Sequence, residues 1–343
     1  MSLDLLKEDI KNKKIKSLYL FYGPEEFLKK YYTDAMQKIL ISEDLKTLNL
    51  IVMEGKVEEK DVIEACETMP VFSERKLVIV KNSNFFKTKK KQGVREDDAE
   101  ETGSTQGELP AYLKNMPSHV CLVFYEQEVK KTLKLVNAIN KNGLVVEFPA
   151  QKPAELVKWV IKGFKSYGKE IDNYTASKLV DTCEQAMNDI LNEIEKLVLY
   201  VGERKAITEK DIDKICIKSV KSKIFDLTDA VAAKDTAKAF SLLDDMLVLK
   251  EPIPKIFFMI DRQLRQLLEV KLLQKEGHTS NEIASKMGMS PYIAGKLIKQ
   301  ASNFSVDKIK SIIKESLSLD VGIKTGQIGD RTALELIIAR FVS

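Results

Sequence analysis

The sequence predicts an α/β domain, with a parallel sheet covered by helices on both faces, followed by a long all-helical region. Up to Pro149, strand-like apolar runs alternate with amphipathic helical segments, which is the pattern of a parallel sheet with both faces covered. From Pro153 onward only helical periodicity remains. Gly23-Pro24 separates the first strand-like run from the helix that follows it, as a strand–turn–helix unit requires.

Composition and charge exclude several classes of protein. A chain of 343 residues with 44% hydrophobic and 31% charged residues is typical of a globular protein of two or three domains. No apolar run approaches the roughly 20 residues of a membrane helix, and Met1–Lys14 lacks the apolar centre of a signal peptide. We therefore expect a cytoplasmic protein with no membrane partner. The net charge of +4, with both signs interspersed, predicts DNA contact that is weak or indirect.

The cysteines and histidines give no pattern of a metal site or of a nucleophile with its base. Four cysteines and two histidines are scattered without paired spacing, which argues against disulfides and zinc. Each cysteine lies in an apolar pattern, so we expect buried, inert thiols. We predict no catalytic group, no metal and no cofactor. The residues concerned are Cys66, Cys121, Cys183, Cys216, His119 and His278.

The first domain is predicted to alternate strands and helices. Pro24 at the first helical position, followed by two glutamates, favours a helix beginning at Glu26. The expected strands are Leu18–Tyr22, Leu48–Met53, Lys76–Val80, Val120–Tyr125 and Leu144–Phe148. The expected helices are Ser2–Lys14, Glu26–Leu40, Lys60–Thr68 and Glu128–Asn140.

The stretch Ser17–Tyr32, SLYLFYGPEEFLKKYY, has the layout of a phosphate-binding P-loop without its chemistry. Against the pattern G-x-x-x-x-G-K-[ST], Gly23 holds the first glycine position and Lys29 holds the lysine position. Leu28 replaces the second glycine, and Lys30 replaces the hydroxyl that binds magnesium. A leucine crowds the backbone that would surround phosphates, and the two glutamates before it would repel them. We expect a degenerate P-loop that binds no nucleotide; an ordinary strand-to-helix turn is the alternative.

A second part of a nucleotide site is also altered. In P-loop ATPases a strand such as Lys76–Val80 ends with an acidic residue that holds magnesium. Here the strand runs into Lys81-Asn82, which cannot hold the ion in that way. Two separate defects make the loss of ATP hydrolysis more credible than either would alone.

The connector Met69-Pro70-Val71-Phe72 interrupts the alternation of elements. Pro70 disfavours helix at Met69, so the preceding helix should end there, and the next strand begins only at Lys76. Three sizeable apolar side chains are thus left in a short connector. They either fold back onto the core or stand exposed as an apolar plug for a partner's pocket, where burying Val71 and Phe72 could give roughly 1.5–3 kcal/mol each.

The most polar stretch is Lys87–Gly107, which is basic in its first half and acidic in its second. It lacks the apolar content to fold alone, so we expect a surface loop. A basic run can contact DNA, and a loop that is merely solvated is the stronger interpretation.

The remaining chain is predicted to be helical throughout, in two groups. The first group is Ala154–Tyr167, Thr175–Cys183, Asp189–Tyr200 and Glu209–Cys216. The second is Ile224–Ala233, Thr236–Leu249, Pro254–Lys275, Ser280–Gly288, Pro291–Ala301, Val306–Leu319 and Arg331–Phe341.

Ser280–Ala301 imitates a helix-turn-helix, with a turn at Gly288 and Lys296 and Lys299 on the second helix. This segment gives the alternative function, a sequence-specific DNA-binding protein. A helical hairpin within a bundle is the structural interpretation, because the second helix offers few groups that could read bases.

Taken in order, these pieces resemble the delta-subunit family of bacterial DNA polymerase III clamp loaders, across essentially the whole chain. The resemblance rests on the order and spacing of several segments. They are YLFYGPEEFLKKYY, ACETMPVFSERKLVIV, NEIEKLVLYVG, IFDLTDAVAAKDTAKAFSLLDDML, EIASKMGMSPYIAGKLIKQA and LELIIARF.

The resemblance implies three domains: a degenerate AAA+ domain over 1–149, a small helical lid-like domain over 150–218 and a helical collar over 219–343. It implies a DNA replication subunit without a catalytic site of its own, acting within a DNA polymerase holoenzyme. Its partners would be the sliding clamp (beta subunit) and, through the collar, the delta-prime and tau/gamma-like ATPases. The clamp would be gripped at Val71 and Phe72, flanked by Met69 and Pro70, and its ring opened for loading onto DNA.

Overall fold

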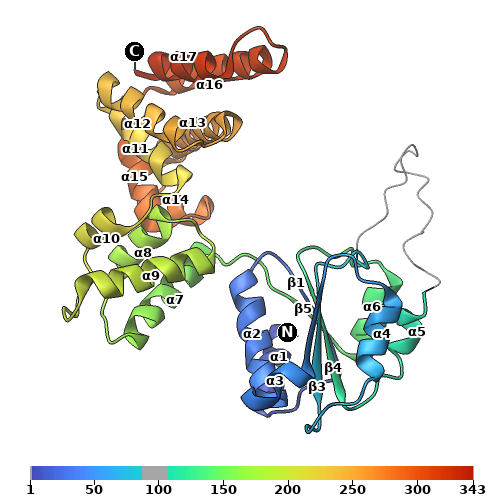
Figure 1. Cartoon of the computed structure of the whole chain (residues 1–343). Helices are drawn as coiled ribbons and strands as arrows, with labels where there is room; N and C mark the ends of the chain where they lie inside the picture. Colours follow the sequence, from blue (N-terminus) through green and yellow to red (C-terminus); the bar gives the residue numbers. More distant parts are fainter. Residues whose placement is uncertain (1, 87–106, 343) are drawn as a thin grey trace. The chain divides into compact units, whose positions relative to one another are not determined.

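The computed structural model describes residues 2–86 and 107–342 and divides into two compact units. Unit 1 is Met1–Gln151 and unit 2 is Lys152–Ser343. Unit 1 contains the strands and unit 2 is helical (Figure 1). The predicted division of the helical region at residue 218 stays a prediction. All but one residue of the predicted charged loop Lys87–Gly107 lie outside the described residues.

Unit 1 is built on a five-stranded parallel sheet with the strand order β2-β3-β4-β1-β5. The first strand of the sequence therefore lies inside the sheet, between β4 and β5. The predicted parallel α/β fold is confirmed. The strands are β1 (Leu18–Tyr22), β2 (Leu50–Glu54), β3 (Lys76–Lys81), β4 (Val120–Glu126) and β5 (Leu144–Glu147).

Helices cover both faces of this sheet. The core on one face joins the strands to α4, α5 and α6, and the core on the other joins them to α1 and α2. The helical elements of unit 1 are α1 (Ser2–Lys11), α2 (Glu26–Leu40), a short 3-10 helix (Glu43–Leu45), α3 (Lys46–Asn49), α4 (Glu59–Glu67), α5 (Leu109–Tyr112) and α6 (Lys134–Asn142).

The continuous apolar runs of the sequence follow from this two-sided burial. In β1, Leu18 and Leu20 enter one core, whereas Tyr19 and Phe21 enter the other. Successive side chains of a strand point to opposite faces, so a strand covered on both sides must be apolar at every position. All five residues of β1 are buried.

The starts of α6 and β2 differ from the sequence prediction for local reasons. α6 begins at Lys134 instead of Glu128, because the preceding residues turn to meet Phe86: the backbone N–H of Lys130 donates to the Phe86 carbonyl at 3.2 Å. The segment predicted as a strand from Leu48 begins with the last turn of α3, and β2 starts at Leu50. Residue patterns in such short segments do not separate helix from strand.

Unit 2 is helical, as predicted. α16 runs five residues beyond its predicted end at Leu319. Among the residues that the structure describes, no helix is both long and apolar enough to cross a membrane. The helices are α7 (Pro153–Ser166), α8 (Asn173–Thr182), α9 (Met187–Val201), α10 (Glu209–Ile215), α11 (Val220–Ala232), α12 (Thr236–Val248), α13 (Ile253–Lys275), α14 (Ser280–Lys286), α15 (Pro291–Ser302), α16 (Val306–Lys324) and α17 (Asp330–Val342).

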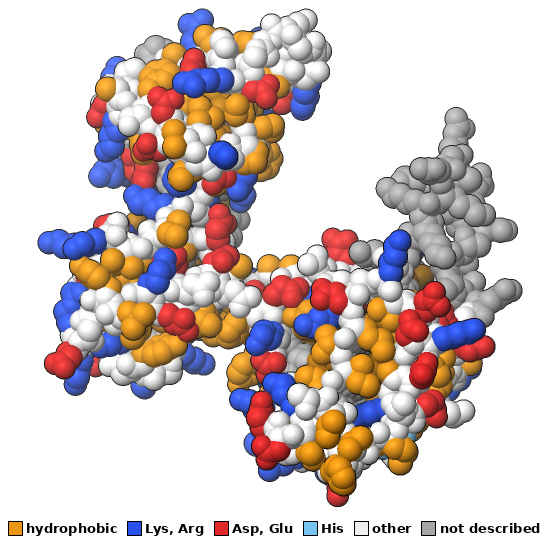
Figure 2. Space-filling model, viewed as in Figure 1, with side chains coloured by type: hydrophobic (Ala, Val, Ile, Leu, Met, Phe, Trp, Pro, Cys, Tyr) orange, Lys and Arg blue, Asp and Glu red, His pale blue; other side chains and the backbone are white. Residues whose placement is uncertain are grey.

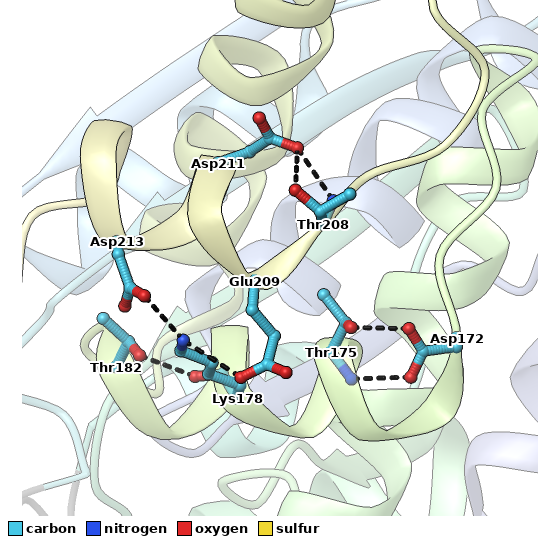
Figure 3. A network of polar contacts seen from close by, with 8 residues as sticks. All are labelled: Asp172, Thr175, Lys178, Thr182, Thr208, Glu209, Asp211 and Asp213. Atoms are coloured by element: carbon cyan, nitrogen blue, oxygen red, sulfur yellow. Dashed lines mark hydrogen bonds and ion pairs between the residues drawn. The ribbon is translucent and has the colours of Figure 1, made fainter.

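A polar network fixes α8 against α10 within unit 2 (Figure 3). The largely buried Lys178 of α8 pairs with Glu209 at 3.1 Å and with Asp213 at 2.8 Å, both on α10. Burial opposes the charged form of Lys178, but the hydrogen bonds that its ammonium donates to the two carboxylates raise its pKa overall. Asp172 caps the start of α8, and Thr208 with Asp211 forms a capping box at the start of α10. These contacts set the packing of the two helices.

Candidate functional site

The connector between α4 and β3 exposes a group of large apolar side chains. Met69, Val71 and Phe72 are 72%, 41% and 89% exposed. Because the connector leads into β3, it lies at the amino ends of the strands. Figure 2 shows hydrophobic side chains gathered at the lower end of unit 1, where β3 begins. The interpretation that these residues fold back onto the core is wrong; in this structure they face solvent.

The centre of the connector is nevertheless hydrogen-bonded to the end of α3. The side chain of Asn49, at the end of α3, is fully buried. Its Oδ1 accepts the backbone N–H of Val71 at 2.7 Å, and its Nδ2 donates to the Val71 carbonyl at 2.8 Å. Both backbone polar groups of Val71 are thereby satisfied, while its side chain points outward.

Two basic side chains fix the ends of the connector. The buried Lys76 ammonium donates to the carbonyls of Ala65 and Thr68 at the end of α4. Burial lowers the pKa of Lys76. The Arg75 guanidinium donates to the Ile15 carbonyl at 2.6 Å, which joins the start of β3 to the segment before β1. The exposed apolar residues are therefore carried on a backbone held at both ends and in the middle.

Phe72 has a left-handed backbone conformation, with φ of 52°. A non-glycine residue seldom adopts positive φ, and a bulky one is a genuine outlier. Such conformations persist where the surrounding structure determines them, and they cluster at functional sites. Phe72, the largest and most exposed side chain of the connector, thus lies on a residue with an uncommon, left-handed backbone conformation.

The degenerate P-loop lies at the opposite end of the sheet. Gly23 follows the carboxyl end of β1, which pairs with β4 on one side and β5 on the other. Ligands of open α/β sheets bind at such carboxyl ends, where the strand order reverses. Gly23 has φ of 119°, and a Cβ there would lie 2.3 Å from the Phe148 carbonyl oxygen. Glycine is therefore required here for the fold, whatever the loop binds.

Lys29 is directed into the protein at this point. Its ammonium, fully buried, donates to the Glu126 carbonyl at 2.9 Å and pairs with Glu26 at 2.6 Å. It also lies 4.6 Å from the centre of the Tyr125 ring, whose hydroxyl donates to the same Glu26 carboxylate at 2.8 Å. Burial first, and this hydrogen bond second, raise the pKa of Tyr125 above its ordinary value. The Lys29 ammonium, which in a P-loop would bind phosphate, is thus hydrogen-bonded to other groups of the protein.

The other altered positions also make protein contacts. The backbone N–H of Glu25 donates to the Phe148 carbonyl at 3.2 Å. Leu28 packs against the core beneath α2, and Lys30 pairs at the surface with Asp34 at 2.7 Å. After β3, Asn82 donates to the Glu54 carboxylate at 3.1 Å. The side chains of Leu28, Lys30 and Asn82 carry neither the hydroxyl nor the carboxylate with which a P-loop protein holds magnesium.

The helix-turn-helix-like segment forms two helices, α14 and α15, with Gly288 at positive φ in the turn. The start of α15 is occupied, because the Ser290 hydroxyl caps the helix and donates to Asp181 of α8. Buried Gln300 of α15 donates to Asp229 of α11 at 2.7 Å. Of the charged residues of α15, only Lys299 is exposed; Lys296 lies half-buried over the Tyr292 ring. The geometry is that of a helical hairpin within a bundle.

One cluster among the described residues has the composition of a partial metal site. Cys183, Glu193 and Cys216 each place a donor atom within 4.8 Å of the others. The hydrogen bond with Cys183, followed by burial, raises the pKa of the Cys216 thiol well above its ordinary value. Lys196 already pairs with Glu193 at 2.7 Å. Three donors are fewer than the four of a closed structural zinc site, so the cluster does not by itself indicate a metal.

Asn49 and Lys76 both hold the connector in place, but no pattern in the sequence indicates this role. Asn49 acts on a residue 22 positions away. Lys76 begins a strand, where a lysine ordinarily faces solvent. An asparagine at the end of a four-residue helix could have suggested a cap, but not this partner.

Two family models match this chain. The model of the DNA polymerase III delta subunit matches residues 19–149, and that of the delta subunit's C-terminal domain matches residues 221–341. The DNA polymerase III subunit delta of Bacillus subtilis is 25% identical over 345 aligned positions, covering 100% of this chain and 97% of that protein. A solved structure of the Bacillus subtilis DNA clamp loader delta protein, also 25% identical, superimposes with a TM-score of 0.54 and covers 100% of this chain and 99% of that one.

The parallel sheet, the strand–glycine turn–helix at its centre and the helical unit that follows define an AAA+-like chain. Together the two family models span more than two thirds of the residues. The chain belongs to the DNA polymerase III delta subunit family, whose members take part in DNA replication.

Proposed function

We propose that this protein binds the sliding clamp through Met69–Phe72 and helps to open the ring for loading onto DNA, without hydrolysing ATP itself. The observation that carries the proposal is the exposure of Phe72 and Met69 on a connector whose backbone is fixed. Large apolar side chains exposed together mark sites of protein–protein contact. A rigid presentation lowers the conformational entropy lost on binding.

The opening of the ring has a simple thermodynamic requirement. A binding protein shifts the clamp toward an open form only if it binds that form more tightly than the closed one. The connector would therefore grip a clamp surface whose shape differs between the two forms. Assembly with ATPase partner subunits would control access to the connector.

The loss of nucleotide chemistry is supported by the contacts of Lys29. Its ammonium is neutralised by Glu26 and occupied by the Glu126 carbonyl. A phosphate would have to displace both and would meet the Glu25 and Glu26 side chains nearby. We infer that the subunit takes no ATP cofactor and acts through binding alone.

The wider assembly follows from family membership. We propose that unit 1 carries clamp binding, that residues 150–218 act as a lid-like domain, and that residues 219–343 form the collar. The partners would be the sliding clamp and, through the collar, delta-prime and tau/gamma-like ATPases, with DNA contacted weakly or indirectly. The cytoplasmic location stays a prediction.

The test is direct binding of the purified protein to its cognate sliding clamp without nucleotide. Phe72→Ala should weaken the affinity by about 2 kcal/mol or more, roughly 30-fold, because it truncates the most exposed anchor. Val71→Ala/Phe72→Ala should abolish measurable binding. Both variants should keep the wild-type circular dichroism spectrum and thermal midpoint, since neither side chain belongs to the core.

The matched control is Leu199→Ala, which truncates an apolar side chain of unit 2 that is 81% exposed. Its clamp affinity should equal that of the wild type. An unchanged affinity of Phe72→Ala would remove the proposed site. A wild-type protein that does not bind the clamp would remove the clamp-opening function.

The alternative of a sequence-specific DNA-binding protein is tested separately. A footprint on defined duplex DNA that is lost on changing Lys296 and Lys299 would support it. The contacts of α15 with the bundle favour no such footprint.

A further inference from the structure

We infer that Asn49 is a positioning residue for the clamp-binding connector, holding the backbone of Val71 in the conformation that the partner meets. The inference rests on the proposed clamp-binding function and adds to it a residue that is itself fully buried. Asn49 therefore acts through Val71 and Phe72 and not by contact with the partner.

The Asn49 side chain bonds both polar groups of the Val71 backbone, as the backbone of a neighbouring strand would do. Asn49 accepts from the Val71 N–H at 2.7 Å and donates to the Val71 carbonyl at 2.8 Å. An amide side chain can do both at once, because it carries one acceptor oxygen and two donor hydrogens. The second hydrogen is used as well: Nδ2 also donates to the Leu45 carbonyl at 3.2 Å. The residue that caps the start of α3 and the connector are thus joined through one side chain.

The consequence for the connector is a fixed backbone next to an exposed aromatic ring. Phe72 follows Val71 directly and has φ of 52°. A connector without the Asn49 contact would sample other backbone conformations in solution, and binding would then have to order it. Because the contact orders it on folding, that entropy is not lost again when the partner binds.

The partner that this arrangement fits is a protein surface with adjacent apolar pockets. Val71 and Phe72 present branched and aromatic side chains, and Met69 presents a flexible one beside them. Aromatic anchors that enter desolvated pockets dominate the affinity of many interfaces. The sliding clamp is the occupant to which the family membership points.

The test uses the full chain with Asn49→Ala and Asn49→Asp, and Asn142→Ala as the matched control. Asn142 also donates from Nδ2 to the carbonyl four residues before it, at 2.9 Å, and its described hydrogen bonds do not reach the connector. Clamp affinity is measured by calorimetry, and hydrogen exchange of the Val71 amide by NMR of protein labelled with ¹⁵N-valine. Circular dichroism gives the folded fraction, by which each affinity is corrected.

Asn49→Ala should weaken clamp binding by about tenfold, as expected when a connector that is no longer held in one conformation must be ordered on binding. Its Val71 amide should exchange at least tenfold faster, because the N–H loses its acceptor. Asn49→Asp keeps an acceptor for the Val71 N–H but sets a second oxygen against the Val71 and Leu45 carbonyls, so the Val71 amide should exchange more slowly than in Asn49→Ala although the affinity still falls. Asn142→Ala should match the wild type in both measurements.

A double variant separates positioning from general stability. If Asn49 acts through Phe72, Asn49→Ala should cost little further affinity in a Phe72→Ala background, since the anchor that it orients is absent. A role in stability alone would reduce binding by the same factor in both backgrounds, and that outcome overturns the inference.

Two further outcomes are decisive. Wild-type affinity together with wild-type Val71 exchange in Asn49→Ala overturns the positioning role. If the wild type itself does not bind the clamp, the proposed function fails, while the exchange of the Val71 amide still decides whether Asn49 orders the connector. Should Asn49→Ala not fold, Asn49→Asp and its double variant with Phe72→Ala carry the same comparison.

Discussion

Single buried polar residues decide what each end of the sheet in unit 1 presents. At the carboxyl end, Lys29 turns inward and its ammonium is taken up by Glu26 and the Glu126 carbonyl. At the amino end, Asn49 turns inward and holds the backbone of Val71 so that apolar side chains face solvent. Under the proposed function, the contacts of Lys29 replace those of a ligand, and the contacts of Asn49 support the partner site.

The contacts of Lys29 make it a structural residue, and Lys29→Met tests this. The variant keeps an unbranched side chain of nearly the same length but leaves the Glu126 carbonyl without its buried donor, so we expect a loss of about 1–3 kcal/mol of unfolding free energy. ATP titration should show no binding in either protein. Lys30→Met, at an exposed surface pair, is the control and should change stability by less than about 0.5 kcal/mol. Measurable ATP binding by the wild type that is lost in Lys29→Met would contradict the expectation.

At the scale of elements, the packing of a helix decides which of its residues remain available. α15 is the second helix of the helix-turn-helix-like segment, but its first turn meets α8 through Ser290 and Asp181, and its last turns meet α11 and α13 through Gln300. The connector after α4 shows the reverse case, in which apolar residues of core type are kept outside by contacts of the backbone. Amphipathic pattern alone does not distinguish these outcomes.

The contact between α15 and α8 predicts a pH dependence of stability. Burial raises the pKa of Asp181 from its ordinary value of 3.8, against the lowering effects of the Ser290 hydrogen bond and of Lys221 and Lys296. Because the carboxylate form is disfavoured in the folded state, the stability that Asp181 contributes is present below its ordinary pKa and is lost as pH rises through the raised value. Asp181→Asn stays neutral and keeps an acceptor for Ser290, so it should not show this loss.

Urea unfolding of both proteins from roughly pH 4 to 8 checks this expectation. The variant should gain stability relative to the wild type as pH rises, and the difference should vanish in acid. A difference between the two proteins that does not change with pH would refute the assignment to Asp181.

At the scale of the whole molecule, the two units have separate cores. The cores on the two faces of the sheet use residues of unit 1, and the large core of α11–α17 uses residues of unit 2. Unit 1 also has the size of a typical single domain. Clamp binding, as proposed, uses only residues of unit 1.

Residues 1–151 produced alone should therefore fold cooperatively and bind the clamp with the affinity of the full chain. Circular dichroism with thermal unfolding tests the first point, and calorimetry with the clamp tests the second. Residues 152–343 should show no clamp binding. If residues 1–151 fold but fail to bind, part of the clamp site lies in unit 2, and the proposal for Met69–Phe72 would be incomplete.

The sequence by itself determined the class of fold and the positions of most elements. Strands covered on both faces are mostly apolar, and amphipathic helices repeat apolar residues with a period of about 3.6. Both patterns can therefore be recognised in the sequence. It also determined the candidate positions: Gly23 and Lys29 fall in the register of a P-loop, and Pro70 ends a helix before apolar residues. Each of these features depends on residues that are close together in the sequence, so the sequence alone is enough to predict it.

Only the tertiary structure decided which groups those positions contact. Phe72 stands exposed beside Val71, whose backbone is hydrogen-bonded to Asn49, 22 residues earlier in the sequence. Whether Lys29 faces a ligand depends on the carbonyl of Glu126, 97 residues away. The strand order that places β1 between β4 and β5 brings these groups together. The partners of such a hydrogen bond follow no pattern in the sequence, because they come together only when the chain has folded.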